Sequence, residues 1–497
     1  MTKKLFTLLL VYLIGHLTSQ SFAAWTSVDL GSGTAPMYGI ALGKGRNDGI
    51  NRVYSSSGDS WVYEFSWETN EWVKAKIGSG TYTMKKIMLA NGRNDNVNRI
   101  YVLNDDKKIY EFDFSGSIWN KRIFSTNRNN ISMFTIGYSR DDNINRLIIA
   151  DIGGFEDIFE YTFLQEGWSY TAKVGGWGDN SYPFLVIGQG RNDDKNRVYT
   201  ADMYYSDFEE YTWTGSYYSK YIVDANMDGA YNDVVIGNGR NDGVNRIYAA
   251  AWNGYMHEYW WIGTAFSKSS IYTGSASALQ CIALGDGRNF GNNRIYAGNS
   301  AGKLFEFRWT GSTWTVTQIY SFPSSVNDIV IGDGRNDGKN RIYVACGDNH
   351  VYELEYYWAK PTEFIGVAIS THSIMWSWKD NATDEAGYQV RDQNHINVSG
   401  NLPPNTTYWY ETGLLANRRY TRYVFGWTTA DDEGYSNFYS LNTLANVPQN
   451  LIGEPHTSTS IKLLWNGDGT RYAIQRAVDM DGTPGEWNYI VTWDNNL

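Results

Sequence analysis

Cysteine and proline are scarce in this sequence of 497 residues, which has two Cys and nine Pro. A single pair, Cys281 and Cys346, cannot form the disulfide framework on which small secreted domains depend. Both residues lie in strand-like, apolar stretches, which favours two small buried side chains. Stability must therefore come from hydrophobic cores, and the length allows about two to four domains.

Histidine is also scarce, and two common metal- and phosphate-binding motifs are missing. The chain has six His, which supply a metal or triad site poorly, and it contains no H-E-x-x-H or G-K-S/T motif. These observations argue against zinc-protease and P-loop chemistry, and no cofactor or metal is expected. A carboxylate pair for glycoside hydrolysis stays an alternative, because Asp and Glu are abundant and sequence spacing does not give their separation.

Positive charge and long apolar runs are in deficit too. The net charge is -11 and the pI is about 5.1, so nucleic acid is not an expected partner. The one long apolar run, Leu5–Leu17, follows Lys3 and Lys4 and precedes Ser21-Phe22-Ala23, as in a signal peptide spanning residues 1–24. No later run approaches the length of a transmembrane segment. We therefore expect a secreted or cell-surface protein.

Aromatic residues, by contrast, are abundant, with 21 Trp, 38 Tyr and 20 Phe. They occur in alternating and β-branched stretches, and no segment shows a sustained helical period. An all-β fold is expected.

One unit occurs seven times. Its opening loop reads "GKGRNDGINRVY" in the first copy and "GDGRNDGKNRIY" in the last. Each copy predicts a four-stranded antiparallel meander, and the spacing of 47 to 51 residues is typical of propeller blades. The last copy lacks its fourth strand, which "WTSVDLG" at the mature N-terminus can supply. The sequence therefore predicts a seven-bladed β-propeller over 25–358, with the N-terminal strand closing blade seven. The first arginines of the seven loops define the spacing: Arg46, Arg93, Arg140, Arg191, Arg240, Arg288 and Arg335.

On these loops the region resembles propellers of the FG-GAP/VCBS type, which often bind calcium through a D-x-D-x-D-G pattern. This chain has Arg at two of the carboxylate positions in every copy, so metal binding is not expected. We expect the guanidinium groups to replace the ion by bonding to the Asp between them and to a Glu in the third strand, with Arg52 directly opposite Glu64. The residues of this structural network are Arg46, Asp48, Arg52 and Glu64 in the first copy, and Arg335, Asp337, Arg341 and Glu353 in the last.

Function is expected where the copies differ, on the face opposite these loops. Its loops in copies three to five are rich in aromatic residues, which could stack on a sugar or could pack beneath long loops. Asp224, Asp228 and Asp233 also cluster there, and a solvated loop is the favoured interpretation. The candidate ligand-binding residues are Trp177, Tyr182, Tyr204, Tyr205, Tyr231, Trp252 and Tyr255.

After the last copy a different pattern begins. Residues 359–445 resemble a fibronectin type III domain through Trp376 or Trp378 on the second strand and through Leu414 and Tyr420 as a tyrosine corner. Residues 446–497 restart this pattern with Trp465 and Tyr472 but reach only about half the usual length. We expect β-sandwich domains, the second of them incomplete, and interpret the sequence as a fragment.

Three functions follow as hypotheses. The first is a non-catalytic binding or adhesion protein whose partner is a carbohydrate or an extracellular protein. The second is an extracellular polysaccharide-degrading glycoside hydrolase or lyase, which would place unlike titratable groups together in the central channel. The third is a structural envelope or self-assembling protein, which would expose a large apolar patch on the propeller rim.

Overall fold

The computed structural model describes residues 24–494, except 125–129, 152–156, 166, 177–183, 203–206, 275, 383–384, 429–432 and 469–471. Every regular element in these ranges is a β-strand, so the described chain has no helix long and apolar enough to cross a membrane. The all-β prediction is confirmed. The strands form two compact units, one of residues Trp25–Tyr356 and another that includes Tyr357–Leu497.

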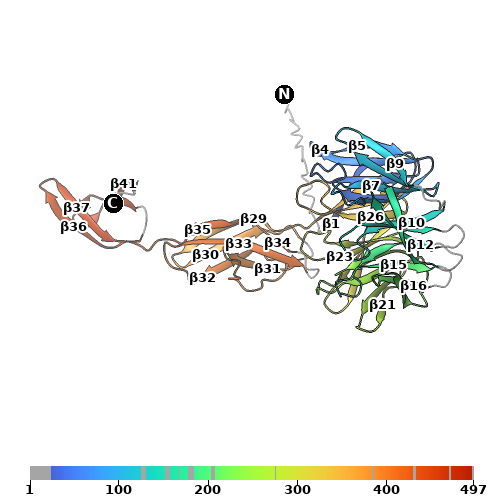
Figure 1. Ribbon diagram of the computed structural model, residues 1–497. Helices are drawn as coiled ribbons and strands as arrows, with labels where there is room; N and C mark the ends of the chain where they lie inside the picture. Colours follow the sequence, from blue (N-terminus) through green and yellow to red (C-terminus); the bar gives the residue numbers. More distant parts are fainter. Residues whose placement is uncertain are drawn as a thin grey trace, which may run out of the picture. The chain divides into compact units, whose positions relative to one another are not determined.

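The described part of the first unit contains seven four-stranded antiparallel sheets, six of which are built from consecutive strands (Figure 1). The first three are β2 (Met37–Gly43), β3 (Arg52–Ser57), β4 (Trp61–Glu68), β5 (Glu71–Ser79); β6 (Met84–Ala90), β7 (Arg99–Asn104), β8 (Ile109–Phe114), β9 (Trp119–Phe124); and β10 (Ile131–Gly137), β11 (Arg146–Asp151), β12 (Asp157–Leu164), β13 (Gly167–Gly175). The next three are β14 (Val186–Gly188), β15 (Arg197–Asp202), β16 (Asp207–Trp213), β17 (Tyr218–Asp224); β18 (Tyr231–Gly237), β19 (Arg246–Ala251), β20 (Met256–Trp261), β21 (Phe266–Tyr272); and β22 (Leu279–Gly285), β23 (Arg294–Asn299), β24 (Lys303–Trp309), β25 (Trp314–Ser321).

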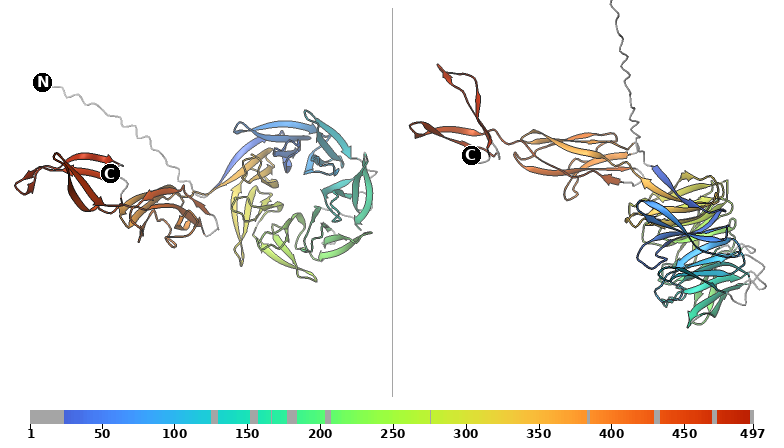
Figure 2. Two further views of the ribbon diagram at one scale, coloured as in Figure 1. Left: turned by 60° about the vertical axis from the view of Figure 1, so that its left-hand side comes forward. Right: turned by 90° about the horizontal axis from the view of Figure 1, so that it is seen from above.

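The remaining sheet joins the two ends of this unit. It contains β26 (Val326–Gly332), β27 (Arg341–Cys346) and β28 (His350–Tyr357), and its fourth strand is β1 (Ala24–Ser32) from the N-terminus. The Thr26 hydroxyl donates to the Glu355 carbonyl oxygen at 3.3 Å across this junction. The N-terminal strand therefore completes the last sheet, as predicted, and the sheets form a ring (Figure 2).

Burial explains why each copy folds in this way. The second strand of a sheet, such as β7, is buried along its whole length, and the fourth strand, such as β5, is mostly exposed. Cores form between neighbouring sheets: Val62 and Ile77 pack with Met84 and Ile87 of the next sheet. The first strands of neighbouring sheets contact one another, so they surround the axis of the ring. One sheet alone would leave an apolar face exposed, and the ring buries it.

The second unit begins with two sheets around one core. One contains β29 (Thr362–Ser370), β30 (Ser373–Lys379) and β32 (Tyr408–Thr412); the other contains β31 (Glu385–Asp392), β33 (Arg419–Thr428), β34 (Glu433–Tyr435) and β35 (Tyr439–Asn442). Trp376 is fully buried and stacks on Phe364, with ring centroids 5.4 Å apart. The Leu415 amide donates to the Tyr420 hydroxyl at 2.9 Å, which is the backbone contact expected of a tyrosine corner.

The end of the chain is more open. It contains β36 (Gln449–Thr457), β37 (Ser460–Asn466), β38 (Tyr472–Arg476), β39 (Asp479–Met480), β40 (Thr483–Pro484) and β41 (Asn488–Asp494), paired as three two-stranded sheets. Trp465 and Tyr472 meet edge to face, with ring centroids 5.3 Å apart. No residue from 446 to 490 whose burial the structure describes is buried, so these strands share no core.

Candidate ligand-binding site

The repeated loop holds each sheet together through a buried carboxylate. In the first copy, the Arg46 guanidinium binds both oxygens of Glu64, with Nε 3.0 Å from Oε2. The Glu64 side chain is buried, so a bidentate guanidinium supplies the partner that an ionised carboxylate needs away from water. The same Arg–Glu ion pair occurs in all seven copies: Arg46–Glu64, Arg93–Glu111, Arg140–Glu160, Arg191–Glu210, Arg240–Glu258, Arg288–Glu306 and Arg335–Glu353.

The second arginine has a different main partner from the one predicted. Glu64 lies opposite Tyr54, because the hairpin turns about Asp59 and not about Gly58, and Arg52 therefore faces Ser66. The prediction that Arg52 lies directly opposite Glu64 is wrong. Arg52 instead binds Asp48 within its own loop, at 2.9 Å, as the same network predicted. The equivalent pair occurs in six copies, including Arg341–Asp337, and the copy with Phe290 is the exception.

These short bonds change the charge behaviour of the loops. Hydrogen bonding from the paired arginine lowers the pKa of the loop Asp in each of these six copies, and for Asp337 it lowers the pKa to about 2. Burial raises the pKa of Glu353, against the lowering effect of Arg335. The loops therefore hold fixed pairs of guanidinium and carboxylate groups.

The same arginines also connect neighbouring sheets. Each first arginine lies over an aromatic ring at the end of the third strand of the next sheet, which is a cation–π contact. The seventh contact closes the ring, because Arg335 lies over Trp67 of the first sheet at 3.9 Å. The other pairs are Arg46–Phe114, Arg93–Phe163, Arg140–Trp213, Arg191–Trp261, Arg240–Trp309 and Arg288–Tyr356, at 3.6 to 4.9 Å.

Asparagines of the loops add a second link between sheets. Asn47 accepts from the Asn98 amide at 2.8 Å and donates to the Asn98 carbonyl oxygen at 3.0 Å, and Asn336 binds Asn51 in the same way. Asn51 also donates to the Asp333 carbonyl oxygen of the preceding loop, so it binds a neighbouring loop rather than its own. Gly49 and its six counterparts, which are Gly, Asn or Asp, adopt positive φ, the backbone conformation that these residue types tolerate best. The loop is a building block of the ring.

The predicted ligand-binding aromatics fall into three groups. Trp177, Tyr182, Tyr204 and Tyr205 lie outside the described residues. Tyr231 is fully buried and bonds to the Tyr259 hydroxyl, so it is a core residue and not a ligand-binding one. Tyr255 is half-buried and packs on His257, whereas Trp252 is 65 % exposed.

Trp252 lies at the channel end of the ring, which we define as the end at which β2, β6, β10, β18, β22 and β26 begin. Its amide donates to the Ala230 carbonyl oxygen at 2.7 Å, just before β18. The three Asp residues that cluster in the sequence have different surroundings in the structure. Asp224 bonds to Tyr259 and Lys268, and the Asp228 carbonyl oxygen accepts from Asn253. Asp233 faces the axis.

A cavity of about 190 Å³ opens at this end, and all seven copies contribute to its lining. We call it the axial cavity. Its charged residues are Lys85, Lys86, Asp233 and Asp328, and Lys85 pairs with Asp105 at 2.7 Å. The other lining residues are Tyr38, Met133, Phe184, Leu185, Asn232, Gln280, Cys281 and Asn327.

Electrostatics couple the three charges that face the axis. Asp328, and less strongly Asp233, raises the pKa of Lys86 in spite of its burial. Burial raises the pKa of Asp233 to about 6, although Lys86 opposes this shift. Burial likewise raises the pKa of the Cys281 thiol well above its usual range, which keeps it protonated and unreactive.

Sequence reasoning missed Lys86 and Asp328, and it took Asp233 for a loop residue. The signal was present in one column of the repeat. This column is the second residue after the start of β2 and the equivalent position of each other copy. Its residues vary in size and charge: Gly39, Lys86, Met133, Phe184, Asp233, Cys281 and Asp328.

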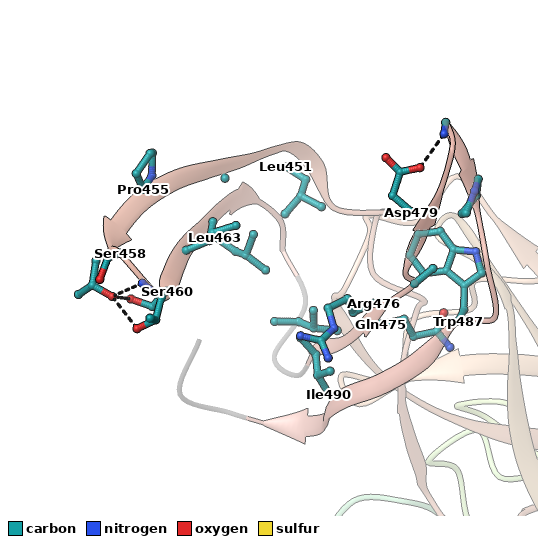
Figure 3. Close-up of a pocket in the computed structure, with 18 residues that line it drawn as sticks. Leu451, Pro455, Ser458, Ser460, Leu463, Gln475, Arg476, Asp479, Trp487 and Ile490 are labelled. Atoms are coloured by element: carbon teal, nitrogen blue, oxygen red, sulfur yellow. Dashed lines mark hydrogen bonds between the residues drawn. The ribbon is translucent and has the colours of Figure 1, made fainter.

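A second hollow, of about 1030 Å³, lies among the strands at the end of the chain (Figure 3). Leu451, Ile461 and Trp487 line it and are 57 to 70 % exposed. Its lining is mainly apolar side chains without a convergent set of charges, so we do not take it as the candidate site.

Comparisons with known proteins support the architecture alone. No protein-family model matches the chain, and no curated protein matches its sequence. Among solved structures, BBS1N in complex with ARL6DN is 14 % identical with a TM-score of 0.50, and the match covers 68 % of this chain and 98 % of that chain. The N-terminal unit is a β-propeller. The WD40 repeats of RRP9 (9 % identical, TM-score 0.49, 67 % of this chain and 97 % of that chain) and Saccharomyces cerevisiae Sqt1 (10 %, 0.47, 68 % and 99 %) are further matches. At such identities the propeller likeness carries no function.

Proposed function

We propose that the protein is a non-catalytic binding protein whose β-propeller presents its channel end to a ligand. One observation carries this proposal. The loop ends of the seven copies are nearly identical and bond to one another, whereas the residues facing the axis at the channel end differ from copy to copy. Differences that folding does not require are where recognition can reside.

We further infer that the seven four-stranded sheets are the blades of a closed propeller of the FG-GAP/VCBS type with its metal ligands replaced. The continuous series of Arg–aromatic contacts supports closure, because the last contact joins the seventh sheet to the first. Residues 359–445 fit a fibronectin type III domain, since Trp376 lies in the core and Tyr420 makes the corner bond. Such a module would act as a spacer that presents the propeller.

The ligand class that we propose first is a carbohydrate. Trp252 offers a flat apolar ring to solvent, and Asn, Gln and Asp side chains line the axial cavity at the same end of the ring, which are the groups that bind sugar rings and hydroxyls. A protein partner is the next hypothesis, in line with BBS1N, whose structure is a complex with ARL6DN. The N-terminal Lys3–Ala24 pattern supports secretion or display at the cell surface.

A glycan array tests this proposal. The full chain, and its Trp252→Ala variant, would be screened in calcium and in chelator. We expect binding that survives the chelator and falls at least about tenfold in Trp252→Ala, as for the loss of one stacked aromatic contact. Tyr217→Ala is the matched control, because Tyr217 is 62 % exposed in the turn before β17. Absence of binding to every glycan would exclude carbohydrate and favour a protein partner.

One observation favours the enzyme hypothesis. The axial cavity holds two carboxyl groups in unlike surroundings, and a raised pKa is what a general acid needs. Release of reducing ends from the bound glycan, abolished in Asp233→Asn, would establish hydrolysis. Intact glycan after prolonged incubation would support the non-catalytic proposal.

A further inference from the structure

The axial cavity has hydrogen-bonding groups whose capacity the described residues use only in part. Asp233 accepts from the Val234 and Ile282 amides at 3.0 and 3.1 Å, and Asp328 accepts from the Ile329 and Ile40 amides at 2.9 and 3.0 Å. A carboxylate can accept about four hydrogen bonds, so about half of the capacity of each remains. These backbone bonds also fix both carboxylates in place.

Donors are available beside these acceptors. The Lys86 ammonium has three N–H groups and makes no direct hydrogen bond or ion pair with any residue that the structure describes. The same holds for the Gln280 amide within those residues. The cavity therefore offers fixed acceptors and free donors to one occupant.

The charge of this set limits what the occupant can be. Two carboxylates in the cavity lining disfavour a phosphate or another anion, and the Lys86 ammonium in the same lining disfavours a metal ion or an organic cation. The described residues also contain no group of three or more His, Cys, Asp or Glu side chains able to hold a metal. An uncharged ligand whose groups both donate and accept hydrogen bonds, such as a polyhydroxyl compound, satisfies both signs.

Size and surface narrow the choice further. A volume of about 190 Å³ corresponds to about six water molecules in the liquid and is below the range of drug-sized pockets. Met133, Phe184 and Leu185 form an apolar part of the wall, and Tyr38, which also lines the cavity, is 39 % exposed. A sugar ring has this combination of a C–H face and a hydroxyl edge, and a single ring suits the volume.

We propose that the axial cavity binds one uncharged sugar unit, such as the end of a glycan chain, with Lys86 and Gln280 donating to its hydroxyl groups and Asp233 and Asp328 accepting from them. The inference rests on the proposed function. It adds that the sugar binds in the axial cavity and that it is uncharged.

Titration of the full chain with the methyl glycosides of glucose, galactose, mannose and N-acetylglucosamine, followed by NMR saturation transfer and calorimetry, tests this assignment. We expect a neutral glycoside to bind, with affinity lost at least about tenfold in Lys86→Met and about threefold or more in Gln280→Ala, because the first removes a charged donor and the second a neutral one. Lys339→Met, an exposed cation in a repeated loop, is the matched control and should bind as the unchanged protein does.

Three results would overturn the inference. The first is that Lys86→Met and Gln280→Ala bind the glycoside as tightly as the unchanged protein, while Trp252→Ala does not bind it. This result would place the sugar on the outer loops and leave the proposed function intact. Another is tighter binding of glucuronate or glucosamine than of the neutral glycosides. The third is that no glycoside binds, in which case binding of longer glycans to the array would still support the proposed function. Unfolding midpoints of all variants, equal within error, would exclude a folding defect.

Discussion

The two ends of the first strand in each sheet differ in the residues that they carry and in what those residues do. At one end, β2 leads into a loop whose Arg46 and Asn47 have counterparts in every copy, with Asp141 in place of Asn in the third. At the other end, the equivalent positions hold a glycine, a lysine, a methionine, a phenylalanine, a cysteine and two aspartates. The first end bonds each sheet to the next, and the second surrounds a cavity.

This contrast separates two uses of charged side chains. At the loop end, each buried carboxylate has a bidentate guanidinium partner, and that guanidinium is also stacked on the next sheet. At the channel end, Lys86 influences the pKa of Asp233 without bonding to it. Satisfied charges stabilise a ring, whereas charges with free valences can bind a ligand. The predictions below test whether the two ends are separable.

The largest effect is expected from Arg335→Met. The change leaves Glu353 buried without its bidentate partner and removes the contact with Trp67 that closes the ring. Breaking a buried pair from one side costs about 3–5 kcal/mol, and we expect the free energy of unfolding to fall by that amount in denaturant titration. Lys339→Met in the same loop should cost less than about 0.5 kcal/mol. Equal losses in the two variants would contradict the role assigned to the loop end.

Acid should weaken the loop end next. The six loop Asp groups have lowered pKa values in the folded protein, so the stability they provide is present above their unfolded pKa near 4 and is lost as the pH falls towards 2. The melting temperature of the propeller should therefore decrease steeply in this window. Asp337→Asn should make the decrease shallower, and an unchanged slope would show that the pair does not act through charge.

A smaller effect is expected from Asn336→Gly. Glycine retains the positive φ of this position, 60° in the structure, and removes the two hydrogen bonds to Asn51 of the first sheet. We expect a loss of about 1 kcal/mol in denaturant titration. Asn336→Ala should lose more, because alanine also strains the turn. If the glycine variant is as stable as the unchanged protein, the asparagine contributes no link between sheets.

The repeat made much of the propeller predictable from sequence, because four alternating segments and one turn loop recur seven times and each copy repeats the signal. The missing fourth strand in the last copy likewise predicted the pairing of β1 with β28. The register of the hairpin was missed, since a turn about Asp59 instead of Gly58 moves Arg52 from Glu64 to Ser66. The cation–π contacts were missed as well, because they join residues of different copies.

The candidate site was harder to predict for a related reason. The axial cavity consists of residues about 50 positions apart, and each of them looks ordinary in its own strand. Tyr231 was misassigned because an aromatic residue beside a polar loop has the same sequence signature whether it faces solvent or the core. In a regular strand Asp233, two residues further on, would share the face of Tyr231, but a β-bulge between the two residues shifts the register, and Asp233 faces the axis.

Thermal unfolding of the full chain in calcium and in chelator tests the central claim most directly, namely that the repeated loops hold the ring with the protein's own charges. An occupied calcium site would raise the melting temperature, because calcium at a hundredfold excess over its Kd adds about 2.7 kcal/mol to the free energy of unfolding. We predict the same melting temperature of the propeller in both buffers. A calcium-dependent increase that disappears in chelator would show that the loops bind metal and would contradict this account.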